Sequence, residues 1–385
     1  MKVLSLFDGI SCGMVALERA GIDVERYCAY EIEEKALKIS KKNYPNIEQR
    51  GDVFDADFRE YSDFDLLIGG SPCTYWSIAQ KDREVTCSGL GFDLFKQFVR
   101  AKRESGCKYF LYENNFSISQ QIKDEISKQL GVSPIVVNSC LVSAQHRKRC
   151  YWTNIPFDMP KDKGILLSDI IESGKVDRKK SLCIARRTIG NQGSQSYMRR
   201  RYFGKSFAQM VFEDCEPEEQ KKLWKEDPFK EFDTKGRIRH LSVLEMERLQ
   251  TLPDGYTECD GVSEIQRAEA IGNGWTVDVI AHIFNGLKEF DKELEKKILK
   301  TENSLLNMLS ETLDDYSSND EIAWLDDAWR CLLKEDDGQT FYRNEERQFT
   351  DEDLVGEIEM LTDRVVRTAL TDHFRRIRKL YLNKK

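Results

Sequence analysis

The sequence predicts an α/β protein with a doubly wound, mostly parallel sheet, a small irregular second domain and a C-terminal helical extension. Three observations lead to this fold class. Short apolar runs alternate with stretches of helical spacing through the first 150 residues, this rhythm stops after Trp152, and helical spacing returns at residue 242 and again in the tail.

The alternating elements follow one another in order along the chain. An apolar run at 3–7 is stopped by Asp8-Gly9, and helical spacing over 14–20 ends at Gly21. A helix is predicted at 33–43, and further strands are predicted at 27–30, 65–68, 109–112 and 135–137. Because strands alternate with helices, we expect a mostly parallel sheet with a ligand site at the carboxyl ends of its strands.

The rest of the chain divides less regularly. Residues 154–238 are rich in Gly, Ser, Lys and Arg and have only short apolar runs, which predicts an irregular, β-containing second domain. Helices at 242–249 and 276–287 are expected to return to the first domain. The predicted domains are therefore residues 1–153 together with 239–290, residues 154–238, and an acidic extension of amphipathic helices at 291–385.

Charge is distributed unevenly along the 385 residues. The chain has 59 Lys and Arg against 67 Asp and Glu, a net charge of -8, so the total charge alone does not indicate a polyanionic partner. Residues 291–385 account for -7 of this, with 16 basic and 23 acidic side chains. Residues 145–210, in contrast, carry 15 basic and five acidic side chains, or +10. A basic segment therefore lies within an acidic protein.

The cysteines and histidines argue against several classes of protein. Eleven cysteines are scattered without any Cys-x-x-Cys pair, and the four histidines are equally dispersed, so no metal site is expected. An odd cysteine count without a signal peptide indicates reduced thiols and a cytoplasmic location. No stretch approaches 18 apolar residues, so no membrane contact is expected.

Three polar positions lie where the first strands end. The turn Phe7-Asp8-Gly9-Ile10-Ser11-Cys12-Gly13 has small residues that let backbone N–H groups approach a ligand. Glu31 follows 23 residues after Asp8, about where an acidic residue binds ribose hydroxyls in doubly wound folds, and Asp52 ends another strand. Each could be an ordinary turn or cap residue, but together they favour a ligand that contains a nucleoside.

Two reactive side chains are predicted at the same edge of the sheet. Cys73 lies in a Gly/Pro loop directly after a buried strand, where nearby positive charge would make a thiolate nucleophile, although most cysteines are small buried hydrophobes. Glu113 follows Tyr112, and a carboxyl beside aromatic rings has a raised pKa and can donate a proton; the alternative is a helix N-terminal acid. Arg147, Lys148 and Arg149 supply cations nearby, or else form a solvated charge run.

These residues, in this order, resemble the cytosine-5 DNA methyltransferase family. The matching blocks cover residues 1 to about 290 and comprise the first-strand Phe-x-Gly turn, Pro72-Cys73, Glu113-Asn114, Gln145-x-Arg147-x-Arg149, Arg248-Leu249-Gln250 with Pro253-Asp254, and Gly272-Asn273. Details such as Trp275-Thr276-Val277 are similar to the de novo-type catalytic domain and to its phage and bacterial relatives, including those of restriction–modification systems. The short 154–238 segment and the lack of reader domains favour the microbial kind.

The resemblance implies a methyltransferase fold and a DNA (cytosine-5)-methyltransferase activity. It implies that the Cys73 thiolate adds to carbon 6 of cytosine while Glu113 protonates N3, and that S-adenosylmethionine donates the methyl group to carbon 5. By the match, Phe7 and Gly9 face the methionine and sulfonium end, Glu31 the ribose and Asp52 the adenine amine. The remaining expected cofactor contacts are Asp8, Ser11, Gly13, Ile32, Val53, Pro72, Asn273 and Trp275.

The same resemblance implies double-stranded DNA as the partner. The target nucleotide must be flipped out of the duplex, and Arg147 and Arg149 are expected to hold the flipped base and its phosphate. Residues 154–238 then form a target-recognition domain, and the basic segment follows the DNA backbone. The expected DNA contacts are Ser77, Arg186, Arg187, Arg199, Arg200 and Arg201.

Some positions depart from the family pattern. Ser11 and Cys12 stand where many relatives have glycines, Asn115 replaces the usual valine after Glu-Asn, and Gly274-Trp275 replaces the common Ser-Val. Two other readings stay open: a tRNA-directed member, whose usual Cys-Phe-Thr signature is missing here, and a catalytically idle DNA-binding regulator. The acidic extension lies outside the resemblance, and we expect it to pack on the catalytic domain or to mediate self-association.

Overall fold

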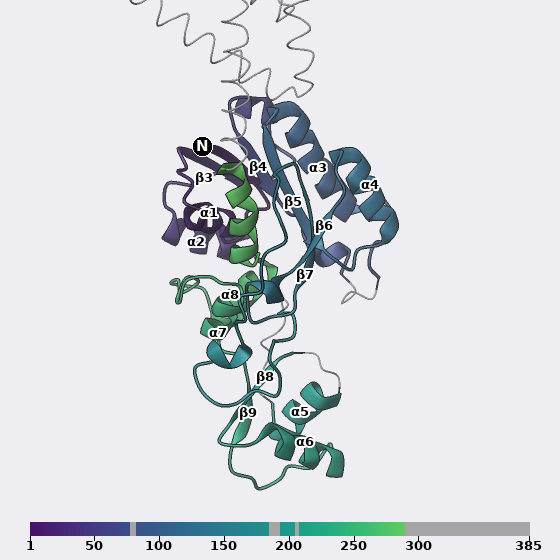
Figure 1. Cartoon of the computed structure of the whole chain (residues 1–385), viewed down its shortest axis with the longest axis vertical. Coiled ribbons are helices and arrows are strands. Elements are labelled where there is room, and N and C mark those ends of the chain that lie inside the picture. The colour runs from purple at the N-terminus through teal and green to yellow at the C-terminus, as the bar shows by residue number, and fades with distance from the viewer. Residues whose placement is uncertain (78–81, 185–192, 205–207, 289–385) are drawn as a thin grey trace, which may run out of the picture. The chain divides into compact units, whose positions relative to one another are not determined.

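The computed structural model describes residues 1–77, 82–184, 193–204 and 208–288, and its central feature is a seven-stranded sheet (Figure 1). The strand order is β3-β2-β1-β4-β5-β7-β6. All neighbouring pairs from β3 to β5 are parallel, whereas β7 runs antiparallel to both β5 and β6. The strands are β1 (Lys2–Leu6), β2 (Arg26–Tyr30), β3 (Glu48–Gln49), β4 (Leu66–Gly69), β5 (Tyr109–Asn115), β6 (Ile135–Asn138) and β7 (Lys148–Thr153). The predicted doubly wound, mostly parallel sheet is confirmed.

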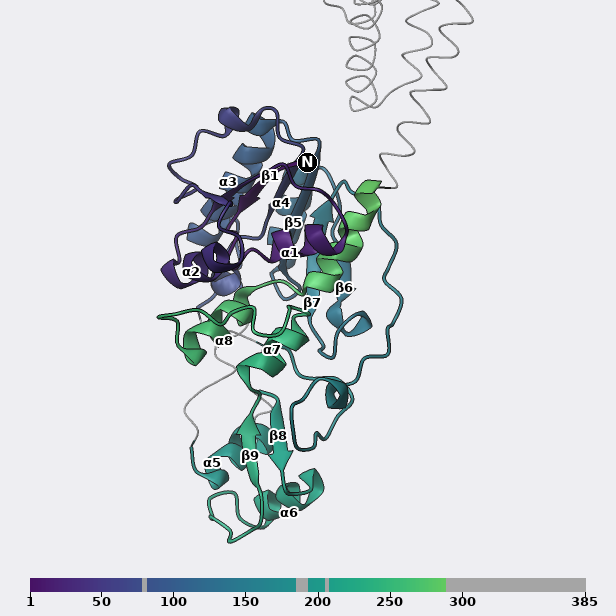
Figure 2. The ribbon, with the colours of Figure 1, turned by 90° about the vertical axis from the view of Figure 1, so that its left-hand side faces the viewer.

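Helices cover both faces of this sheet (Figures 1 and 2). One face is covered by α3 and α4, whose apolar side chains share a core with β1, β4, β5 and β7. On the other face lie α1 and a helix that starts at residue 277. The helices that connect or follow the strands are α1 (Cys12–Arg19), α2 (Glu34–Asn43), α3 (Leu90–Ser105), α4 (Gln120–Leu130), α7 (Val243–Leu249) and α8 (Glu264–Asn273).

Short one-turn helices complete this part of the chain. They are η1 (Phe58–Tyr61), η2 (Cys73–Tyr75), η3 (Ser139–Leu141) and η4 (Leu167–Asp169). The helix η2 follows β4 directly and carries the predicted nucleophile position at its first residue. The predicted loop after the third strand is therefore a tight helical turn at the carboxyl end of β4.

Strand ends explain why the reactive positions gather at one edge. The strands β1, β4 and β5 are parallel and nearly fully buried, so the residues that follow them emerge together at their carboxyl ends. Burial in β5 continues through Glu113, Asn114 and Asn115, three residues beyond the predicted end of that strand. The sequence did not predict β7, because its first residues are Lys148 and Arg149, which read as a charge run.

A second, smaller core lies within the predicted 154–238 segment. An antiparallel pair, β8 (Met210–Glu213) and β9 (Arg237–His240), packs with α5 (Gln195–Arg199), the π-helical turn η5 (Arg200–Gly204) and α6 (Pro217–Glu226). Its apolar cluster contains Met198, Tyr202, Met210, Phe212 and Ile238. The expected β content is present, while the domain boundaries stay a prediction. Residues 291–385, the predicted acidic extension, lie outside the described residues.

His240 gives this region an expected pH dependence. Its side chain is buried at the end of β9, and neither ring nitrogen has a hydrogen-bond partner among the described residues. Burial, with a smaller contribution from the charge of Arg201, lowers the pKa of His240 to about 4. The folded-state pKa of His240 is therefore lower than the unfolded-state value of about 6.5. The contribution of the neutral side chain to the free energy of unfolding is fully present above pH 6.5 and is lost as pH falls towards 4.

We predict that His240→Phe flattens the acid side of the stability profile. The wild-type free energy of unfolding should fall more steeply between about pH 6.5 and about pH 4, by at most about 1.4 kcal/mol per pH unit for one proton. Urea unfolding of both proteins across this range measures the difference. Parallel pH profiles for the two proteins would contradict the assigned burial of a neutral imidazole.

Candidate active site

A cavity of about 320 Å³ lies at the carboxyl ends of the parallel strands. It is lined by the turn after β1, the end of β2, the loop after β4, the end of β5, and residues of α8 and the turn that follows it. Nine predicted cofactor residues line it: Phe7, Asp8, Gly9, Gly13, Glu31, Ile32, Pro72, Asn273 and Trp275. Glu113, Arg147 and Arg149 line the same cavity, so the structure brings two predicted groups of residues together.

The turn after β1 is held in an unusual backbone conformation. Phe7, Gly9 and Ser11 all have positive φ angles, of 58°, 60° and 59°. Such angles are uncommon for Phe and Ser and persist only where surrounding contacts hold them. Asp8 supplies those contacts, because its carboxylate accepts hydrogen bonds from the hydroxyls of Ser5, Ser11 and Tyr27 at 2.6, 2.6 and 2.7 Å. Burial nevertheless raises the pKa of Asp8.

Glu31 connects this turn to the end of β2. One of its carboxylate oxygens accepts from the backbone N–H of Gly9 at 2.8 Å, and the other accepts from those of Ile32 and Glu33 at 2.8 and 2.7 Å. Burial raises the pKa of Glu31, and these three donors oppose that shift. The neighbouring Ile32 is 70% exposed, although it lines the cavity. An exposed apolar side chain on a cavity wall suits a flat, apolar ligand surface.

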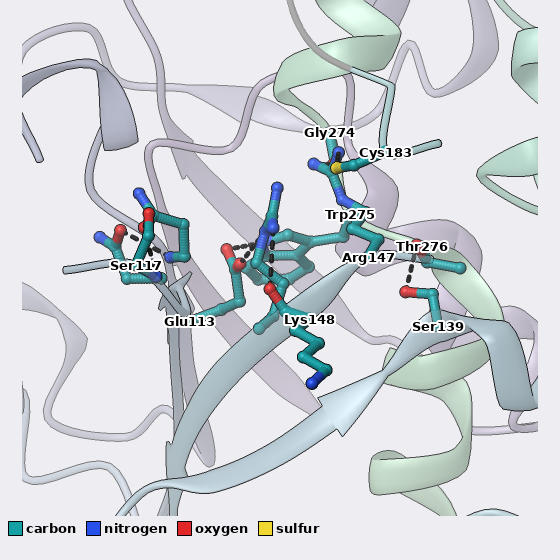
Figure 3. Close-up of polar contacts among 12 residues, drawn as sticks. Glu113, Ser117, Ser139, Arg147, Lys148, Cys183, Gly274, Trp275 and Thr276 are labelled. Atoms are coloured by element: carbon teal, nitrogen blue, oxygen red, sulfur yellow. Dashed lines mark hydrogen bonds and ion pairs between the residues drawn. The ribbon is translucent and has the colours of Figure 1, made fainter. Parts of the chain in front are cut away.

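Glu113 lies at the far end of β5 and is almost entirely buried. Its Oε2 accepts a hydrogen bond from the indole Nε1 of Trp275 at 2.8 Å (Figure 3). Its Oε1 forms an ion pair with Nε of Arg149 at 3.1 Å. Burial raises the pKa of Glu113, while the charges of Arg149 and Arg147 and the indole hydrogen bond oppose this. A buried carboxyl with a raised pKa is suited to donate a proton.

The loop after β4 approaches this carboxyl closely. A Cβ atom on Gly70 would lie 3.0 Å from Oε2 of Glu113 and 2.9 Å from its backbone oxygen, so this position needs a glycine. Gly70, Ser71, Pro72 and Thr74 all line the cavity. The side chain of Cys73 lies outside what the structure describes, so its role stays a prediction that rests on the position of its neighbours.

Arg147 is a buried structural residue as well as a wall of the cavity. Its Nη1 donates to the backbone oxygen of Ile184 at 2.8 Å, and its Nη2 donates to those of Gly272 and Gly274 at 3.1 and 2.9 Å. Figure 3 shows the guanidinium beside Gly274. The predicted contact of Arg147 with a flipped nucleotide stays untested, and the structure adds the role of fixing the 272–274 turn.

Gln250, from the Arg-Leu-Gln motif, holds the same turn from another side. Its amide nitrogen donates to the backbone oxygens of Ile271 and Gly274 at 3.0 and 2.9 Å, and its amide oxygen accepts from Gln145 and Thr276 at 2.9 and 2.8 Å. Gln250 is completely buried. This set of hydrogen bonds joins segments that are more than a hundred residues apart in sequence.

Three predicted cofactor residues take other places. Ser11, Asp52 and Val53 are not among the described residues that line the cavity. Ser11 is fully buried and bonds to Asp8 and Ser40, and Val53 is part of the apolar core. Asp52 accepts from the backbone N–H of Phe54 at 3.0 Å, as in an ordinary turn. Their contact with a cofactor stays a prediction.

The residues predicted to contact DNA differ in their burial. The side chain of Arg199 is fully buried, and its guanidinium donates to Oε1 of Gln220 and to the backbone oxygen of Lys230, both at 3.0 Å, so its contact with DNA stays a prediction. Arg200 is half-buried and stacks over Phe229, and Arg201 is also half-buried. Ser77 lies half-buried after η2, and Arg186 and Arg187 lie outside the described residues.

Sequence reasoning missed one reactive group beside the site. Cys183 is not among the residues singled out from the sequence; this residue is exposed, and its sulfur lies 3.7 Å from Nη1 of Arg147. Desolvation raises the pKa of this thiol, but the nearby charges of Arg147 and Arg149 outweigh that effect and lower it. Nothing in the local sequence indicates this, because the contact joins positions 36 residues apart.

Within the part of the chain that the structure describes, no group of three or more His, Cys, Asp or Glu side chains is placed to hold a metal ion. None of the described helices combines the length and apolar character that crossing a bilayer requires.

Comparison with known sequences gives one family. Residues 1–172 and 160–289 match the family described as C-5 cytosine-specific DNA methylase. Among curated proteins, the orphan methyltransferase M.SPRI of Bacillus phage SPR is 30% identical over 196 residues, 46% of this chain and 43% of that protein. The type II methyltransferase M.NgoBV of Neisseria gonorrhoeae is 27% identical over 205 residues, 45% of this chain and 47% of that protein. The matches span less than half the length of these relatives.

Comparison with solved structures supports the fold. The Dnmt2 methyltransferase of S. pombe covers 75% of this chain and 99% of its own, with a TM-score of 0.54 and 17% identity. A DNMT2 mutant of Spodoptera frugiperda covers 74% and 99%, with a TM-score of 0.55 and 17% identity. At these identities the likeness is one of fold.

We predict that Arg147→Lys destabilises the protein by about 2–3 kcal/mol, because one ammonium group cannot reproduce the planar fork that donates both to Ile184 and to Gly272, so buried hydrogen bonds are lost. Urea unfolding measures the loss. The control is Arg59→Lys, at an exposed ion pair with Asp57, which should cost less than about 1 kcal/mol. Equal effects of the two substitutions would refute the structural role of Arg147.

Proposed function

Since the chain belongs to the C-5 cytosine-specific DNA methylase family, we propose that it methylates carbon 5 of cytosine in duplex DNA, using S-adenosylmethionine and a covalent Cys73 adduct. The observation that carries the proposal is the environment of Glu113. This buried carboxyl has a raised pKa, it faces the cavity that the Phe7-Gly9 turn also lines, and the loop residues on both sides of Cys73 line that cavity too.

The cavity suits S-adenosylmethionine. Glu31 presents a fixed carboxylate after β2 and is hydrogen-bonded to Gly9, Ile32 offers an exposed apolar side chain, and Phe7 and Trp275 also line the cavity. We assign the ribose hydroxyls to Glu31, one face of the adenine to Ile32, and the methionine end to Phe7 and Gly9. S-adenosylmethionine, when bound, supplies an electrophilic methyl group on a sulfonium centre.

The proposed chemistry needs a nucleophile and a proton donor on the same base. A bond forms between Sγ of Cys73 and carbon 6 of cytosine, the electrons of the 5,6 double bond form a 4,5 double bond, and N3 takes up a proton from Glu113. The resulting enamine is nucleophilic at carbon 5. Carbon 5 takes the methyl group as the sulfur–methyl bond breaks, with S-adenosylhomocysteine as the leaving group. A base then removes the carbon 5 proton, the 5,6 double bond re-forms, Cys73 departs as a thiolate, and the proton on N3 returns to the carboxylate of Glu113.

The substrate must come out of its helix to reach this site. Carbon 5 and carbon 6 are inaccessible in a stacked duplex, so the cytosine must be flipped into the cavity. Unstacking and unpairing this one base costs about a few kcal/mol. Arg149, which lines the cavity beside Glu113, is the cation we assign to the flipped nucleotide. The +10 segment at 145–210 fits the DNA backbone, with binding that weakens as salt increases.

We propose duplex DNA as the substrate because the curated relatives are phage and bacterial methyltransferases, including the type II enzyme M.NgoBV, and because the family description names DNA. RNA is the alternative, and the trapping experiment below includes it as an outcome.

The cofactor assignment predicts a selective loss of affinity in Ile32→Ala. Covering an exposed isoleucine with the adenine buries apolar surface that alanine lacks, so we expect about tenfold weaker binding of S-adenosylmethionine. Isothermal titration calorimetry measures it. Ile265→Ala is the matched control, since Ile265 is 49% exposed and is not among the described cavity-lining residues. Unchanged affinity in Ile32→Ala would rule out the adenine assignment.

The covalent step predicts trapping on DNA in which 5-fluorocytosine replaces cytosine. Fluorine at carbon 5 cannot leave as a proton does, so the adduct with Cys73 persists and migrates as a complex on a denaturing gel. Wild type should be trapped in the presence of S-adenosylmethionine, Cys73→Ala should not, and Glu113→Gln should react more than about tenfold more slowly.

Cys87→Ala is the control for the Cys73 substitution. Cys87 is half-buried in the same loop, and its thiol contacts the backbone of Gln121, so this variant should be trapped as wild type is. Trapping on 5-fluorocytosine RNA alone would overturn the DNA substrate. The absence of an adduct on either nucleic acid would overturn the proposed enzyme.

A further inference from the structure

The hydrogen bond between Trp275 and Glu113 links two parts of the site that are 162 residues apart in sequence. The indole of Trp275 donates to Oε2 of Glu113 at 2.8 Å (Figure 3). Nε of Arg149 forms an ion pair with Oε1 at 3.1 Å. Each carboxyl oxygen therefore has one fixed partner. Rotation of the carboxyl group about its last bond would break both contacts.

Trp275 is itself held rigidly at its backbone. The carbonyl that precedes it, on Gly274, accepts hydrogen bonds from Arg147 and from Gln250, both at 2.9 Å. The hydroxyl of the residue that follows it, Thr276, donates to Gln250 at 2.8 Å and accepts from Ser139 at 2.9 Å. The turn is fixed on both sides of the tryptophan.

The ring of Trp275 lies beside two glycines, Gly70 and Gly13. A Cβ atom on Gly70 would lie 3.4 Å from its Nε1, and one on Gly13 would lie 3.7 Å from its Cζ3. Its backbone N–H donates to the thiol of Cys12, whose pKa is raised to about 12 by burial and which therefore stays neutral. The indole thus extends from the first turn of α1 to the carboxyl of Glu113 and leaves its N–H pointing at one acceptor.

The groups that face Glu113 differ in what they can do when its proton moves. The titratable and charged groups around it are Arg147, Arg149, Cys150, Tyr112 and Tyr151, with Cys73 in the adjacent loop. The two arginines are positive at all relevant pH values and favour the ionised carboxylate. An indole N–H is neutral and donor-only, so it can hold a carboxyl oxygen in both protonation states.

We propose that Trp275 is a positioning residue for Glu113: its indole N–H holds the carboxyl in the orientation from which it protonates the base. This inference rests on the proposed function, because it assigns Glu113 the role of proton donor. It adds a second role to the expected place of Trp275 in the cofactor wall. The wall of the cofactor cavity and the acid of the base site are then one hydrogen-bonded unit.

The test replaces Trp275 by phenylalanine, which keeps an aromatic wall and removes the N–H. Adduct formation on 5-fluorocytosine DNA at saturating S-adenosylmethionine should slow by about tenfold or more, while the cofactor dissociation constant changes by less than about twofold. The hydrogen bond favours the ionised carboxylate, so its loss raises the pKa of Glu113. Glu113 then stays protonated to higher pH, and the alkaline limb of the rate profile should shift upwards.

A double-mutant cycle separates positioning from general damage. In a Glu113→Gln background, Trp275→Phe should cause little further loss, because the group it acts through has been removed. Trp152→Phe is the matched control: it also removes a buried indole hydrogen bond, of 2.9 Å to Ser127, and should keep the wild-type pH profile. Trp275→Leu, which also has no side-chain donor, is the second variant, to be measured in the same way if the first does not fold.

The outcomes are distinct. An unreactive wild-type protein would mean that the proposed function fails. A reactive wild type with an unchanged rate and an unchanged alkaline limb in the Trp275 variants would overturn the positioning role, as would additive losses in the cycle. A loss of rate that saturating cofactor fully restores would make Trp275 a cofactor contact alone.

Discussion

The buried carboxyl of Glu113 is the constraint on which the site depends. Removing a carboxyl group from water favours its protonated form, whereas a neighbouring guanidinium favours the ionised form. Here burial is the larger influence on the pKa, and Arg149, Arg147 and Trp275 oppose it. A group balanced in this way can hold a proton and still release it, and the fold must keep all three partners in place for that balance to hold.

The fold meets this requirement by joining distant segments with buried hydrogen bonds. Gln250 and Arg147 share the carbonyl of Gly274, and the turn they hold delivers Trp275 to the end of β5. Because buried polar atoms without partners are costly, loss of Arg147 or of Gln250 would remove a donor from the turn that carries the indole contacting the acid. The Arg-Leu-Gln motif therefore acts on the site through the backbone of another segment.

Much of the site could be predicted from the sequence, because the order of strands and helices determines which residues lie at the ligand-binding edge of the sheet. Parallel strands that alternate with helices place their carboxyl ends at one edge, so Gly9, Glu31 and Glu113 could be grouped from strand positions alone. The resemblance to cytosine-5 methyltransferases added Trp275, and the match of residues 1–289 to that family confirms its basis. The strand β7 was missed because its first two residues are charged, although its last four residues are buried.

What could not be predicted depends on contacts between distant positions. Arg199 belongs to a basic run that suggests DNA binding, yet its guanidinium is buried against Gln220 and the backbone of Lys230. Cys183 looks like any other cysteine in the sequence, but the fold sets it beside Arg147. The bond from Trp275 to Glu113 joins residues on two elements with no shared local pattern. Charge and spacing show which residues are present, whereas burial and partners decide what they do.

The most direct test of this account is the titration of Glu113 itself. Infrared difference spectra between the wild-type protein and Glu113→Gln, from about pH 4 to about pH 8, isolate the carbonyl band of the protonated acid. The account predicts a band that persists above the ordinary glutamate pKa of about 4.3 and disappears as pH rises further. A carboxyl that is already ionised at or below that value would contradict the claim that burial keeps a proton available in the site.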